Sequence, residues 1–402
     1  MKLHRFTRFW CLLGIAIVAV GGAAMGSAAV PEPSTGLKVD VTPNPGVYGN
    51  IIRGVSAVNK SDVWGVGVQA TDSSNNTLAI HWNGTSWSAI STPNPAPDCV
   101  DGDILWSGQS LNGVAAVSAT DVWAVGNGCY SNNTLIEHWN GTAWSMVASP
   151  RLRIDGGDSW ATLHGVEAIS SSNVWAVGYQ DAGGIQPLIE HWDGHNWAVV
   201  PSASPGVTES YLTSVSGTGP NDIWAVGGAD PSSNLIQHWN GTSWSIVASP
   251  QPTRSSLDSV TAISPTNAWA VGSKHAATGA EVTFTLHWNG TTWSEVPSPN
   301  PSTAASASNQ LRSVAAVSPD NVWAVGMYES EQTNVHQHRT LVLHWNGVSW
   351  SIVSSPQPGR TSELNVATTT ASRVFAAGVW SLYDRNIYDG HYTLPQTLVM
   401  HH

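Results

Sequence analysis

The stretch that decides the fold is Ser118-Ala-Thr-Asp-Val-Trp-Ala-Val-Gly126 followed by Glu137-His-Trp-Asn-Gly-Thr-Ala-Trp144, because copies of both recur along the 402 residues. The aromatic residues of the first half are Trp64, Trp123, Trp175, Trp224, Trp269, Trp323 and Phe375. The histidines of the second half are His81, His138, His191, His238, His287, His344 and His401. The period of 45 to 59 residues indicates a repeat architecture with seven units.

Each repeat contains four short runs of β-branched and aromatic residues, bounded by turn residues, which predict four strands. The innermost run is small and mainly apolar. An Asn-Gly pair separates the third run from the fourth and predicts a primed hairpin turn, in which both central residues have positive φ. Four-stranded antiparallel sheets that repeat radially form a β-propeller, so we predict an all-β, seven-bladed β-propeller.

The two ends of the chain predict how the ring closes. The seventh copy stops after its third strand at His402, whereas Leu37–Gly46 aligns with Trp350–Gly359, which completes the sixth copy. We therefore expect residues 37–42 to be the fourth strand of the last blade, which removes an exposed edge. Residues 30–402 are predicted to form one propeller domain.

The DVWAVG and HWNGTxW motifs resemble the repeats of secreted bacterial seven-bladed β-propellers. This loose group lies near the sialidase-like Asp-box, kelch-like and photosystem II assembly-factor-like propellers. The Asp-box pattern itself is not met, because Asn83-Gly-Thr-Ser-Trp87 lacks the aspartate two residues before the glycine. The resemblance implies a fold and does not imply a function, because propellers host many unrelated activities.

Residues 1–29 have the pattern of a signal peptide: basic residues, an apolar run from Phe9 to Val20, and small residues up to Ala29. We expect cleavage after Ala29 and a secreted, extracytoplasmic protein, with an uncleaved membrane anchor as the alternative. Removal of these residues changes the formal charge from −12 to −15. An acidic chain argues against nucleic acid and anionic membranes as partners.

Two cysteines remain after the predicted signal peptide, Cys99 and Cys129. Both are expected in loops on one face of the second blade. Export favours a disulfide between them, and two free thiols are the alternative.

Loop lengths differ between the two faces of the predicted ring. Nine residues separate the first-strand valine from the second-strand aromatic in all seven copies, ending with Val366 and Phe375, so these turns are expected to be invariant. On the opposite face, the spacing from the Val-Gly glycine to the last aromatic position ranges from 12 (Gly227 to Trp239) to 24 (Gly378 to His402). Loops of variable length on a rigid scaffold often bind ligands.

Aromatic residues that belong to no repeat position lie in these variable loops or at their edges. Flat rings with a polar edge suit contact with sugars and protein hot spots, although they would also pack long loops onto the blades. The predicted ligand-binding residues are Trp106, Trp160, Trp380, Tyr48, Tyr130, Tyr179, Tyr211, Tyr328, Tyr383, Tyr388 and Tyr392.

The repeated histidines are expected to be structural, each hydrogen-bonded to the Asp or Asn before the second strand of its blade. The Asn-Gly-Thr triplets match a glycan acceptor, but their hairpin position favours turn chemistry. No metal or cofactor is assigned. The weaker alternatives are calcium at Asp98–Asp103, a transition metal at His336, His338 and His391, and glycosidic carboxylates at Asp101, Asp103, Asp155 and Asp158.

The sequence thus predicts an extracytoplasmic binding module that presents aromatic loops to a carbohydrate or protein ligand. The alternatives are an exported glycan-degrading enzyme, hydrolase or lyase, that uses loop carboxylates, and an envelope assembly scaffold. Catalysis is not favoured, and the sequence assigns no oligomeric state.

Overall fold

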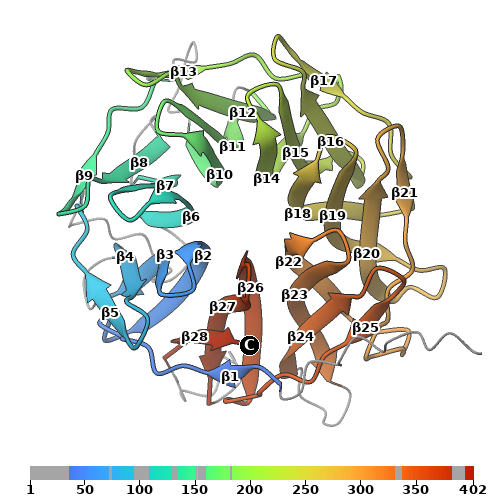
Figure 1. Cartoon of the computed structure of the whole chain (residues 1–402). Helices are drawn as coiled ribbons and strands as arrows, with labels where there is room; N and C mark the ends of the chain where they lie inside the picture. Colours follow the sequence, from blue (N-terminus) through green and yellow to red (C-terminus); the bar gives the residue numbers. More distant parts are fainter. Residues whose placement is uncertain are drawn as a thin grey trace, which may run out of the picture. The chain divides into compact units, whose positions relative to one another are not determined.

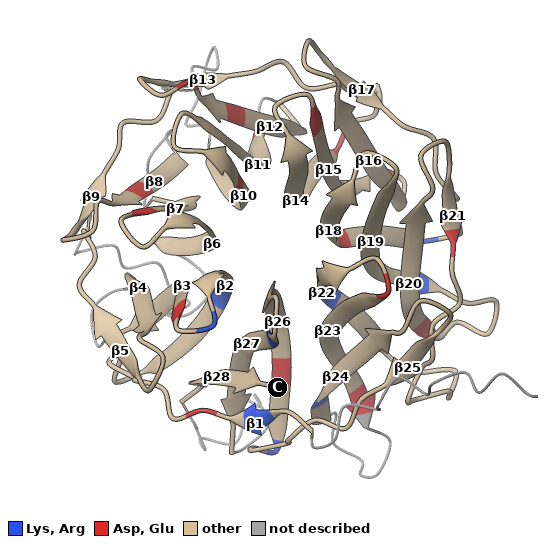
Figure 2. Ribbon diagram, viewed as in Figure 1, with Lys and Arg blue, Asp and Glu red and all other residues tan. Residues whose placement is uncertain are grey.

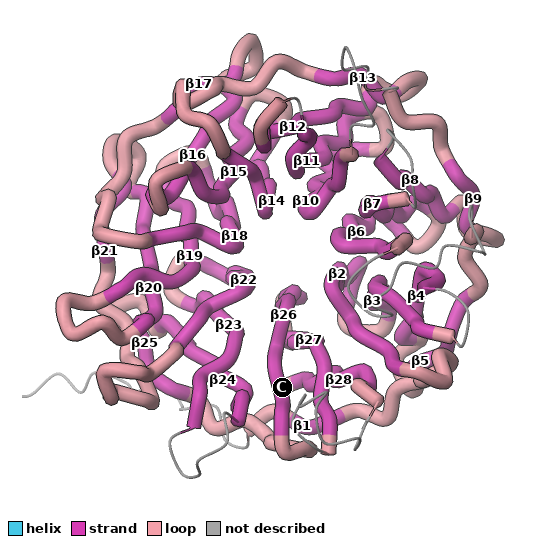
Figure 3. Tube along the Cα trace, turned by 180° about the vertical axis from the view of Figure 1, so that it is seen from behind, coloured by secondary structure: helices cyan, strands magenta, loops and turns pink. Residues whose placement is uncertain are grey.

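The computed structural model describes residues 36–71, 75–94, 108–128, 134–150, 152, 160–181, 183–330, 337–382 and 394–402. In these residues, seven four-stranded antiparallel sheets stand in a ring about one axis (Figure 1). Seen from behind, the same ring consists of strands joined by loops (Figure 3). The predicted all-β, seven-bladed β-propeller is confirmed. The part of the chain that the structure describes has no helix suited to crossing a lipid bilayer.

Each blade has four strands, and the blades are numbered here in the order of their innermost strands. The innermost strands are β2 (Gly49–Asn59), β6 (Ser110–Ser118), β10 (Ala161–Ser170), β14 (Ser210–Gly219), β18 (Ser255–Ser264), β22 (Asn309–Ser318) and β26 (Thr361–Thr370). The second strands are β3 (Asp62–Ala70), β7 (Asp121–Asn127), β11 (Asn173–Asp181), β15 (Asp222–Ala229), β19 (Asn267–His275), β23 (Asn321–Ser330) and β27 (Arg373–Ser381). The third strands are β4 (Asn75–Trp82), β8 (Thr134–Trp139), β12 (Ile185–Trp192), β16 (Ser233–Trp239), β20 (Glu281–Trp288), β24 (Gln337–Trp345) and β28 (Gln396–His401). The outermost strands are β5 (Trp87–Ile90), β9 (Trp144–Met146), β13 (Trp197–Val199), β17 (Trp244–Ile246), β21 (Trp293–Glu295), β25 (Trp350–Ile352) and β1 (Lys38–Val39).

The N-terminal strand closes the ring, as predicted. In β1, Lys38 pairs with His401 and Val39 with Met400 of β28, and the Asp40 N–H donates to the Val399 carbonyl over 2.9 Å. Figure 1 shows this blue strand beside the red end of the chain. The paired segment is shorter than the predicted 37–42. This pairing completes the sheet of blade 7, so that all seven blades have four strands.

The repeated aromatic residues form the joints between neighbouring blades. Trp64 of β3 stacks on His81 of its own blade at a centroid distance of 4.3 Å. The other side of Trp64 meets two rings of the next blade, Trp139 at 4.9 Å and Trp144 at 5.4 Å in an edge-to-face contact. The same arrangement recurs at Trp123, Trp175, Trp224 and Trp269. Buried aromatic pairs of this kind add to the apolar burial, so the repeat motif encodes the contact between blades.

The histidine of each third strand has the predicted structural partner in six blades. His81 Nε2 lies 2.8 Å from Asp62 Oδ1, and His287 Nε2 lies 3.1 Å from Asn267 Oδ1. The equivalent bonds in the other four of these blades measure 2.7 to 3.0 Å and involve His138, His191, His238 and His344. These bonds link the third strand to the start of the second within one blade, which confirms their structural role.

In every blade, steric hindrance excludes any residue other than glycine at the Val-Gly position (Ala-Gly in blade 7). A Cβ atom on Gly126 would lie 1.8 Å from the Ser110 carbonyl oxygen, and on Gly272 it would lie 2.1 Å from the Ser256 carbonyl oxygen. The innermost strand passes so close to the second strand there that no other residue fits. The glycine therefore permits the bulge described below.

The predicted primed turn at Asn-Gly is wrong. Trp82 pairs with Trp87, so four residues form the loop, and Asn83 Oδ1 accepts hydrogen bonds from the Thr85 and Ser86 N–H groups. Gly84 has a φ of 97°, whereas Asn83 is not among the residues with positive φ. The side-chain oxygen of the asparagine thus caps two backbone N–H groups of the turn. The same bonds at Asn140, Asn240 and Asn289 support turn chemistry for the Asn-Gly-Thr triplets.

The turn after the innermost strand has two residues in every blade, as expected, but the choice of Val366 as the equivalent valine of the last blade is wrong. In blade 6, Val314 pairs with Ala324, and the register shifts again between Ala316 and Ser318. In blade 7 it is Ala367 that pairs with Ala376, and no second shift follows. The last hairpin thus lacks the residue of the second bulge, while its turn keeps the same length. Ala367, rather than Val366, is the equivalent of Val314.

Candidate functional site: the axial channel and its loop mouth

A β-bulge occurs at one position in every innermost strand and turns one side chain toward the axis. The ladder shifts, for example, between Leu212 and Ser214, which leaves Thr213 as the extra residue. We call the seven bulged residues the bulge ring: Arg53, Asn112, His164, Thr213, Asp258, Arg312 and Asn365. They line an axial cavity of about 530 Å³. Bulges often redirect side chains at binding sites.

The channel has two different ends. The innermost strands start at the end that carries the blade-to-blade loops and the loops between second and third strands, which we call the loop mouth. They finish at the other end, the hairpin mouth. Since Thr213 is the fourth residue of β14, the bulge ring lies in the half of the channel near the loop mouth.

Short polar members of the bulge ring tie each blade to the next. Asn112 Nδ2 donates to the Leu163 carbonyl over 2.9 Å, and Thr213 Oγ1 donates to the Leu257 carbonyl over 3.0 Å. Asn365 Nδ2 reaches across the closure to the Ile52 carbonyl, 3.1 Å away. These three side chains donate their hydrogen bonds to the backbone of the next blade, and they thereby stabilise the contact between neighbouring blades.

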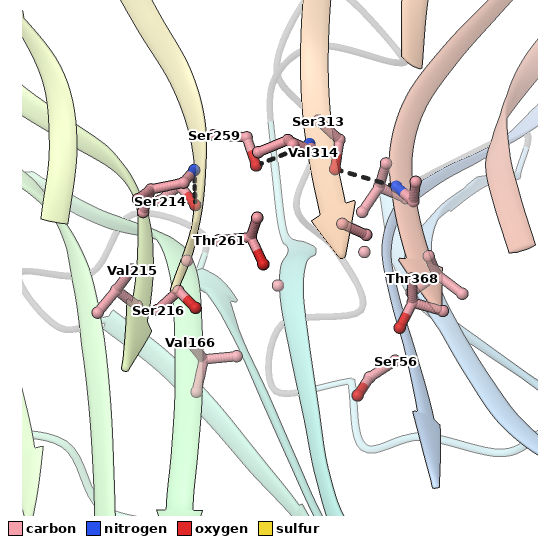
Figure 4. A pocket seen from close by; sticks show the side chains of 18 of the residues that line it. Ser56, Val166, Ser214, Val215, Ser216, Ser259, Thr261, Ser313, Val314 and Thr368 are labelled. Carbon is pink, nitrogen blue, oxygen red and sulfur yellow. Dashed lines mark hydrogen bonds between the residues drawn. The ribbon is translucent and has the colours of Figure 1, made fainter. Parts of the chain in front are cut away.

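A second layer of hydroxyl groups lies next to the bulge ring. The hydroxyls of Ser214, Ser259 and Ser313 accept the N–H of the next blade's innermost strand over 3.0 to 3.2 Å. Figure 4 shows these serines along the channel wall, with Thr261 and Thr368 nearby. The wall is polar although the strands are rich in small apolar residues.

Two arginines of the bulge ring have neighbours that fix them. Arg53 Nη1 donates to Ser110 Oγ over 3.1 Å and to Asn112 Oδ1 over 2.9 Å. Arg312 Nη1 lies 2.7 Å from Glu363 Oε2, a carboxylate of blade 7 that is 6% exposed. The two cations belong to β2 and β22, on either side of blade 7 (Figure 2). Both guanidinium groups are therefore held by side chains of the next blade.

Besides Arg53, whose pKa is lowered by burial, three titratable groups of the channel have shifted pKa values. Burial raises the pKa of Asp258 to about 7, with the Arg312 charge lowering it and the Glu281 charge raising it in part. Burial also raises the pKa of Glu167 to about 7. Burial and then the Arg53 charge lower the pKa of His164 to about 4, so this imidazole is neutral at physiological pH.

Aromatic rings gather at the loop mouth over blades 3 and 4. The Trp160 ring, 48% exposed, meets Tyr179 edge-to-face at 5.3 Å. Tyr179 also stacks on His164 at 5.3 Å and meets Tyr211 of the next blade at 6.4 Å. We call these four residues the aromatic rim. Through His164 the rim continues into the axial channel.

Beside the rim lies a hollow of about 310 Å³ between blades 4 and 5, which we call the rim hollow. Its lining includes Tyr211, Glu209, Asp230, Arg254 and Glu281. Carboxylates thus outnumber arginines in this lining. His275 also lines it, with Nδ1 3.2 Å from the Gly279 oxygen.

Glu281 is held as a carboxylate at the wall of this hollow. Burial alone would raise the pKa of Glu281, but hydrogen bonds from Gln310, Ser273 and Ser308 lower it below its ordinary value. These bonds measure 2.9, 2.7 and 2.7 Å. The carboxylate is fixed before any ligand arrives.

Two residues of the hollow have an uncommon backbone conformation. Ser232 has a φ of 72° and Arg254 a φ of 51°. Non-glycine residues rarely adopt positive φ, and strain of this kind gathers at functional sites. Among the residues that the structure describes, Ser232 and Arg254 are the only non-glycine residues with positive φ, and both line the rim hollow.

The structure brings together three of the predicted ligand-binding residues, Trp160, Tyr179 and Tyr211. Tyr48 is 43% exposed in the segment before β2 of blade 1. Tyr328 and Trp380 pack partly against the cores between blades. Tyr328 and Trp380 therefore match the alternative in which an aromatic side chain packs a loop onto its blade.

The other predicted positions lie outside the described residues. They are Trp106, Tyr130, Tyr383, Tyr388 and Tyr392, both cysteines Cys99 and Cys129, the carboxylates Asp101, Asp103, Asp155 and Asp158, and His336 and His391. His338 is described, and its Nδ1 lies 2.6 Å from Glu363 Oε1. In the described part of the chain, no group of three or more His, Cys, Asp or Glu side chains is arranged to hold a metal ion.

Sequence reasoning missed the bulge ring. The signal was present as a column of seven polar residues, each directly after the buried Leu or Ile of the innermost run. Small neighbours such as Gly113 and Ser259 made these runs look like simple packing strands. A repeat alignment centred on the bulge would reveal the column.

The chain is similar in fold to several solved structures. YCF48 bound to D1 peptide is 13% identical with a TM-score of 0.54, over 92% of this chain and 96% of that one. RRP9 WD40 repeats are 13% identical with a TM-score of 0.55, over 91% and 97%. The GH74 xyloglucanase from Xanthomonas campestris is 12% identical with a TM-score of 0.55, over 90% of this chain and 55% of that one.

Neither a protein-family model nor a curated protein sequence matches the chain. At identities this low, the likeness to solved structures shows the fold alone. The chain is thus a seven-bladed β-propeller whose structural neighbours include WD40 repeats and a GH74 xyloglucanase.

Proposed function

We propose that this protein is an extracytoplasmic binding module that holds a carbohydrate or protein ligand at the loop mouth. The observation that carries the proposal is the aromatic rim. Trp160 keeps 48% of its surface exposed while its ring is fixed against Tyr179. An exposed ring that is already oriented loses little entropy when a ligand covers it.

The position of the rim supports the same function. Trp160 directly precedes β10, Tyr179 lies in β11 and Tyr211 lies in β14, so strands of two rigid blades place the rings. The rim borders both the axial cavity and the rim hollow. Ligands commonly bind in a concave site with apolar rings and a few fixed polar groups.

The experiment compares two exposed aromatic residues of different position. Residues 30–402, Trp160→Ala and Tyr48→Ala are tested on a glycan array and in pull-downs from culture supernatant of the source organism. Trp160→Ala is expected to weaken binding about tenfold or more, as for an interface hot spot. Tyr48→Ala, with similar exposure on blade 1, is expected to change binding less than twofold. Equal effects of the two variants would contradict a site at the rim.

Two alternatives remain predictions. A glycan-degrading enzyme would use the loop carboxylates Asp101, Asp103, Asp155 and Asp158, which lie outside the described residues. Product release that is lost in Asp101→Asn or Asp155→Asn would support it. An envelope scaffold would instead co-purify with one stoichiometric protein partner, and its binding would survive Trp160→Ala.

A further inference from the structure

The rim hollow continues the aromatic rim, because Tyr211 belongs to both. The centroid of the Tyr179 ring lies 5.3 Å from that of Trp160 and 6.4 Å from that of Tyr211. A Cβ atom on Gly228, which also lines the hollow, would lie 2.6 Å from the Tyr211 hydroxyl oxygen. The Tyr211 ring therefore lies against the wall of the hollow, and a row of rings leads from the exposed Trp160 to it.

Glu281 offers the hollow one acceptor position. A carboxylate accepts about four hydrogen bonds, two at each oxygen. The Oε2 atom of Glu281 accepts from Ser308 and Gln310 over 2.7 and 2.9 Å, and neither of these donors is among the described residues that line the hollow. The Oε1 atom accepts from Ser273 over 2.7 Å, and Ser273 does line the hollow. The remaining acceptor position is thus at Oε1, on the side of the hollow.

Arg254 adds hydrogen-bond donors to the same lining. Its guanidinium forms no ion pair with any residue that the structure describes. The Arg254 carbonyl accepts the His275 N–H over 3.2 Å, and the Ser232 carbonyl accepts the Ser255 N–H over 3.1 Å. These backbone bonds hold both residues with positive φ, so the lining is in place before a ligand binds.

The lining of the hollow suits a polar ligand. In the described part of the chain, it contains five serines and no aliphatic side chain larger than that of Ala229. A protein partner that binds through an apolar anchor needs an apolar pocket. The hollow offers such an anchor only the Tyr211 ring, whereas its hydroxyl, carboxylate and guanidinium groups can bond to a ligand that is polar on all sides.

The charges of the lining favour a neutral ligand. Glu209, Asp230 and Glu281 would repel an anion. A cation would meet the charge of Arg254, and Glu281 cannot bind a guanidinium through both oxygens, because both positions of Oε2 are taken. Glu209 and Asp230 are exposed, so water and salt weaken their attraction for a cation. Hydroxyl groups can donate to the carboxylates and accept from Arg254, so neither charge opposes them.

We infer that the ligand of the loop mouth is a neutral oligosaccharide, with one sugar unit in the rim hollow on Glu281 and Arg254 and the following units across Tyr211 toward Trp160. This inference rests on the proposed function and adds the chemical class of the ligand. One hydroxyl of the sugar in the hollow donates to Glu281 Oε1, and another accepts from Arg254. The apolar faces of the following sugars lie on the rings, whose spacing is comparable to the length of one sugar unit.

The first test varies the charge of the sugar. Residues 30–402 are titrated at pH 6 with linear tetrasaccharides, and isothermal titration calorimetry measures their affinity. The neutral probes consist of glucose, mannose, galactose or N-acetylglucosamine, the cationic probe of glucosamine and the anionic probe of galacturonic acid. At least one neutral tetrasaccharide is expected to bind about tenfold more tightly than both charged probes. Equal or tighter binding of a charged probe, or no binding of any neutral one, would overturn the inference.

The second test locates the sugar unit in the hollow. Glu281→Gln keeps an oxygen for Ser308 and Gln310 but turns an amide N–H toward the hollow, and Arg254→Asn removes the guanidinium with a residue that tolerates positive φ. Each should weaken the best neutral tetrasaccharide about tenfold, and Asp320→Asn, at an exposed carboxylate of the hairpin mouth, less than about twofold. Circular dichroism checks folding, and the exposed Arg254 keeps the test decisive if Glu281→Gln unfolds. Unchanged binding in either folded variant would overturn the site.

The length of the sugar chain tests the row of rings toward Trp160. Trp160→Ala should weaken the tetrasaccharide about tenfold and leave the affinity for the disaccharide of the same sugar unchanged. Equal losses for both lengths would contradict the placement of the chain across Tyr211.

Other outcomes separate the two proposals. A protein partner that is lost in Trp160→Ala, with no neutral tetrasaccharide bound, would overturn the oligosaccharide but would keep the binding module. Absence of both glycan binding and a protein partner would remove both proposals.

Discussion

The Nδ1 atom of His401 lies 2.7 Å from Oδ1 of Asp40, which joins the third strand of blade 7 to the N-terminal segment. The contact falls short of hydrogen-bond geometry, so it acts as an ion pair when His401 is protonated. In six blades the histidine instead bonds to the first residue of its own second strand, but blade 7 has Arg373 there. The closing segment thus supplies the carboxylate that the last repeat lacks.

Asp40→Ala should destabilise the closure. Asp40 Oδ2 also accepts the Trp87 Nε1–H of blade 1 over 3.1 Å, so the substitution leaves this indole without its acceptor and His401 without its carboxylate partner. We expect a loss of about 2 kcal/mol in the free energy of unfolding. Urea unfolding measures it, and hydrogen exchange should quicken in β28 before β16. Asp320→Asn is the control. Unchanged exchange in β28 would contradict a closing role for Asp40.

The stability of the protein should fall as pH rises, because of a carboxyl group buried between blades 1 and 2. Burial raises the pKa of Glu137 to about 8 from an ordinary value of 4.5. Neither of its oxygens meets hydrogen-bond geometry, although the Thr77 hydroxyl is close enough to oppose part of the rise. The stability from the protonated form is complete below pH 4.5 and is lost as pH rises through 8. Glu190, with a pKa of about 7, acts in the same direction.

Glu137→Gln should flatten this dependence. Blade 4 has Gln237 at the equivalent position, where its side chain bonds to both Ala203 N and Ala203 O. A pKa difference of one unit corresponds to about 1.4 kcal/mol, so we expect the variant to gain about 2 kcal/mol relative to the parent between pH 6 and pH 9. Urea midpoints at both pH values measure it. An unchanged difference between the two pH values would show that Glu137 does not titrate in the folded state.

Gly272→Ala should be among the most damaging single changes. The new Cβ would lie 2.1 Å from the Ser256 oxygen, so two strands must separate. We expect a loss of about 3 kcal/mol or more in stability. Gly219→Ala is the matched control, because its Cβ meets no atom within 4 Å. A thermal unfolding series compares them. Equal melting temperatures would mean that the close approach at the bulge is not needed.

His164 should stay neutral across the physiological range. Burial and the Arg53 charge lower its pKa to about 4, so its imidazole resonances should not titrate between pH 5.5 and 8. Arg53→Met removes the second cause and should raise the pKa of His164 by about one unit. Histidine NMR spectra at several pH values measure it, and His164→Gln assigns the resonance. Titration of His164 near pH 6.5 in the parent would contradict a desolvated position in the channel.

The sequence predicts the architecture because the same tryptophans and histidines repeat at every joint. Trp64, His81 and Trp87 each perform a contact that the repeat requires, so their spacing reveals the sheets. The closure was predictable as well, because the strand that the last repeat lacks is present near Lys38. These features depend on patterns of many residues, which small local differences do not disturb.

The remaining features depend on register and neighbours. A spacing of nine residues from Val366 to Phe375 hides that Ala367 is the true equivalent, because this hairpin lacks the second bulge of the other blades. The rim needs Trp160, Tyr179 and Tyr211 from two blades, and only folding shows which rings meet. Asp258 and Glu167 have shifted pKa values because of the channel around them. None of these properties belongs to a residue type alone.

The seam between β1 and β28 also governs how the molecule comes into being. Thr42 and Thr397, which bond across it, are 355 positions apart, so the ribosome delivers Thr42 long before Thr397. Until the two strands pair, β28 has an open edge, and β1 of another copy of the chain would fit it equally well. Crowded refolding should therefore yield rings linked by exchanged strands, and slow, dilute refolding should favour the solitary ring.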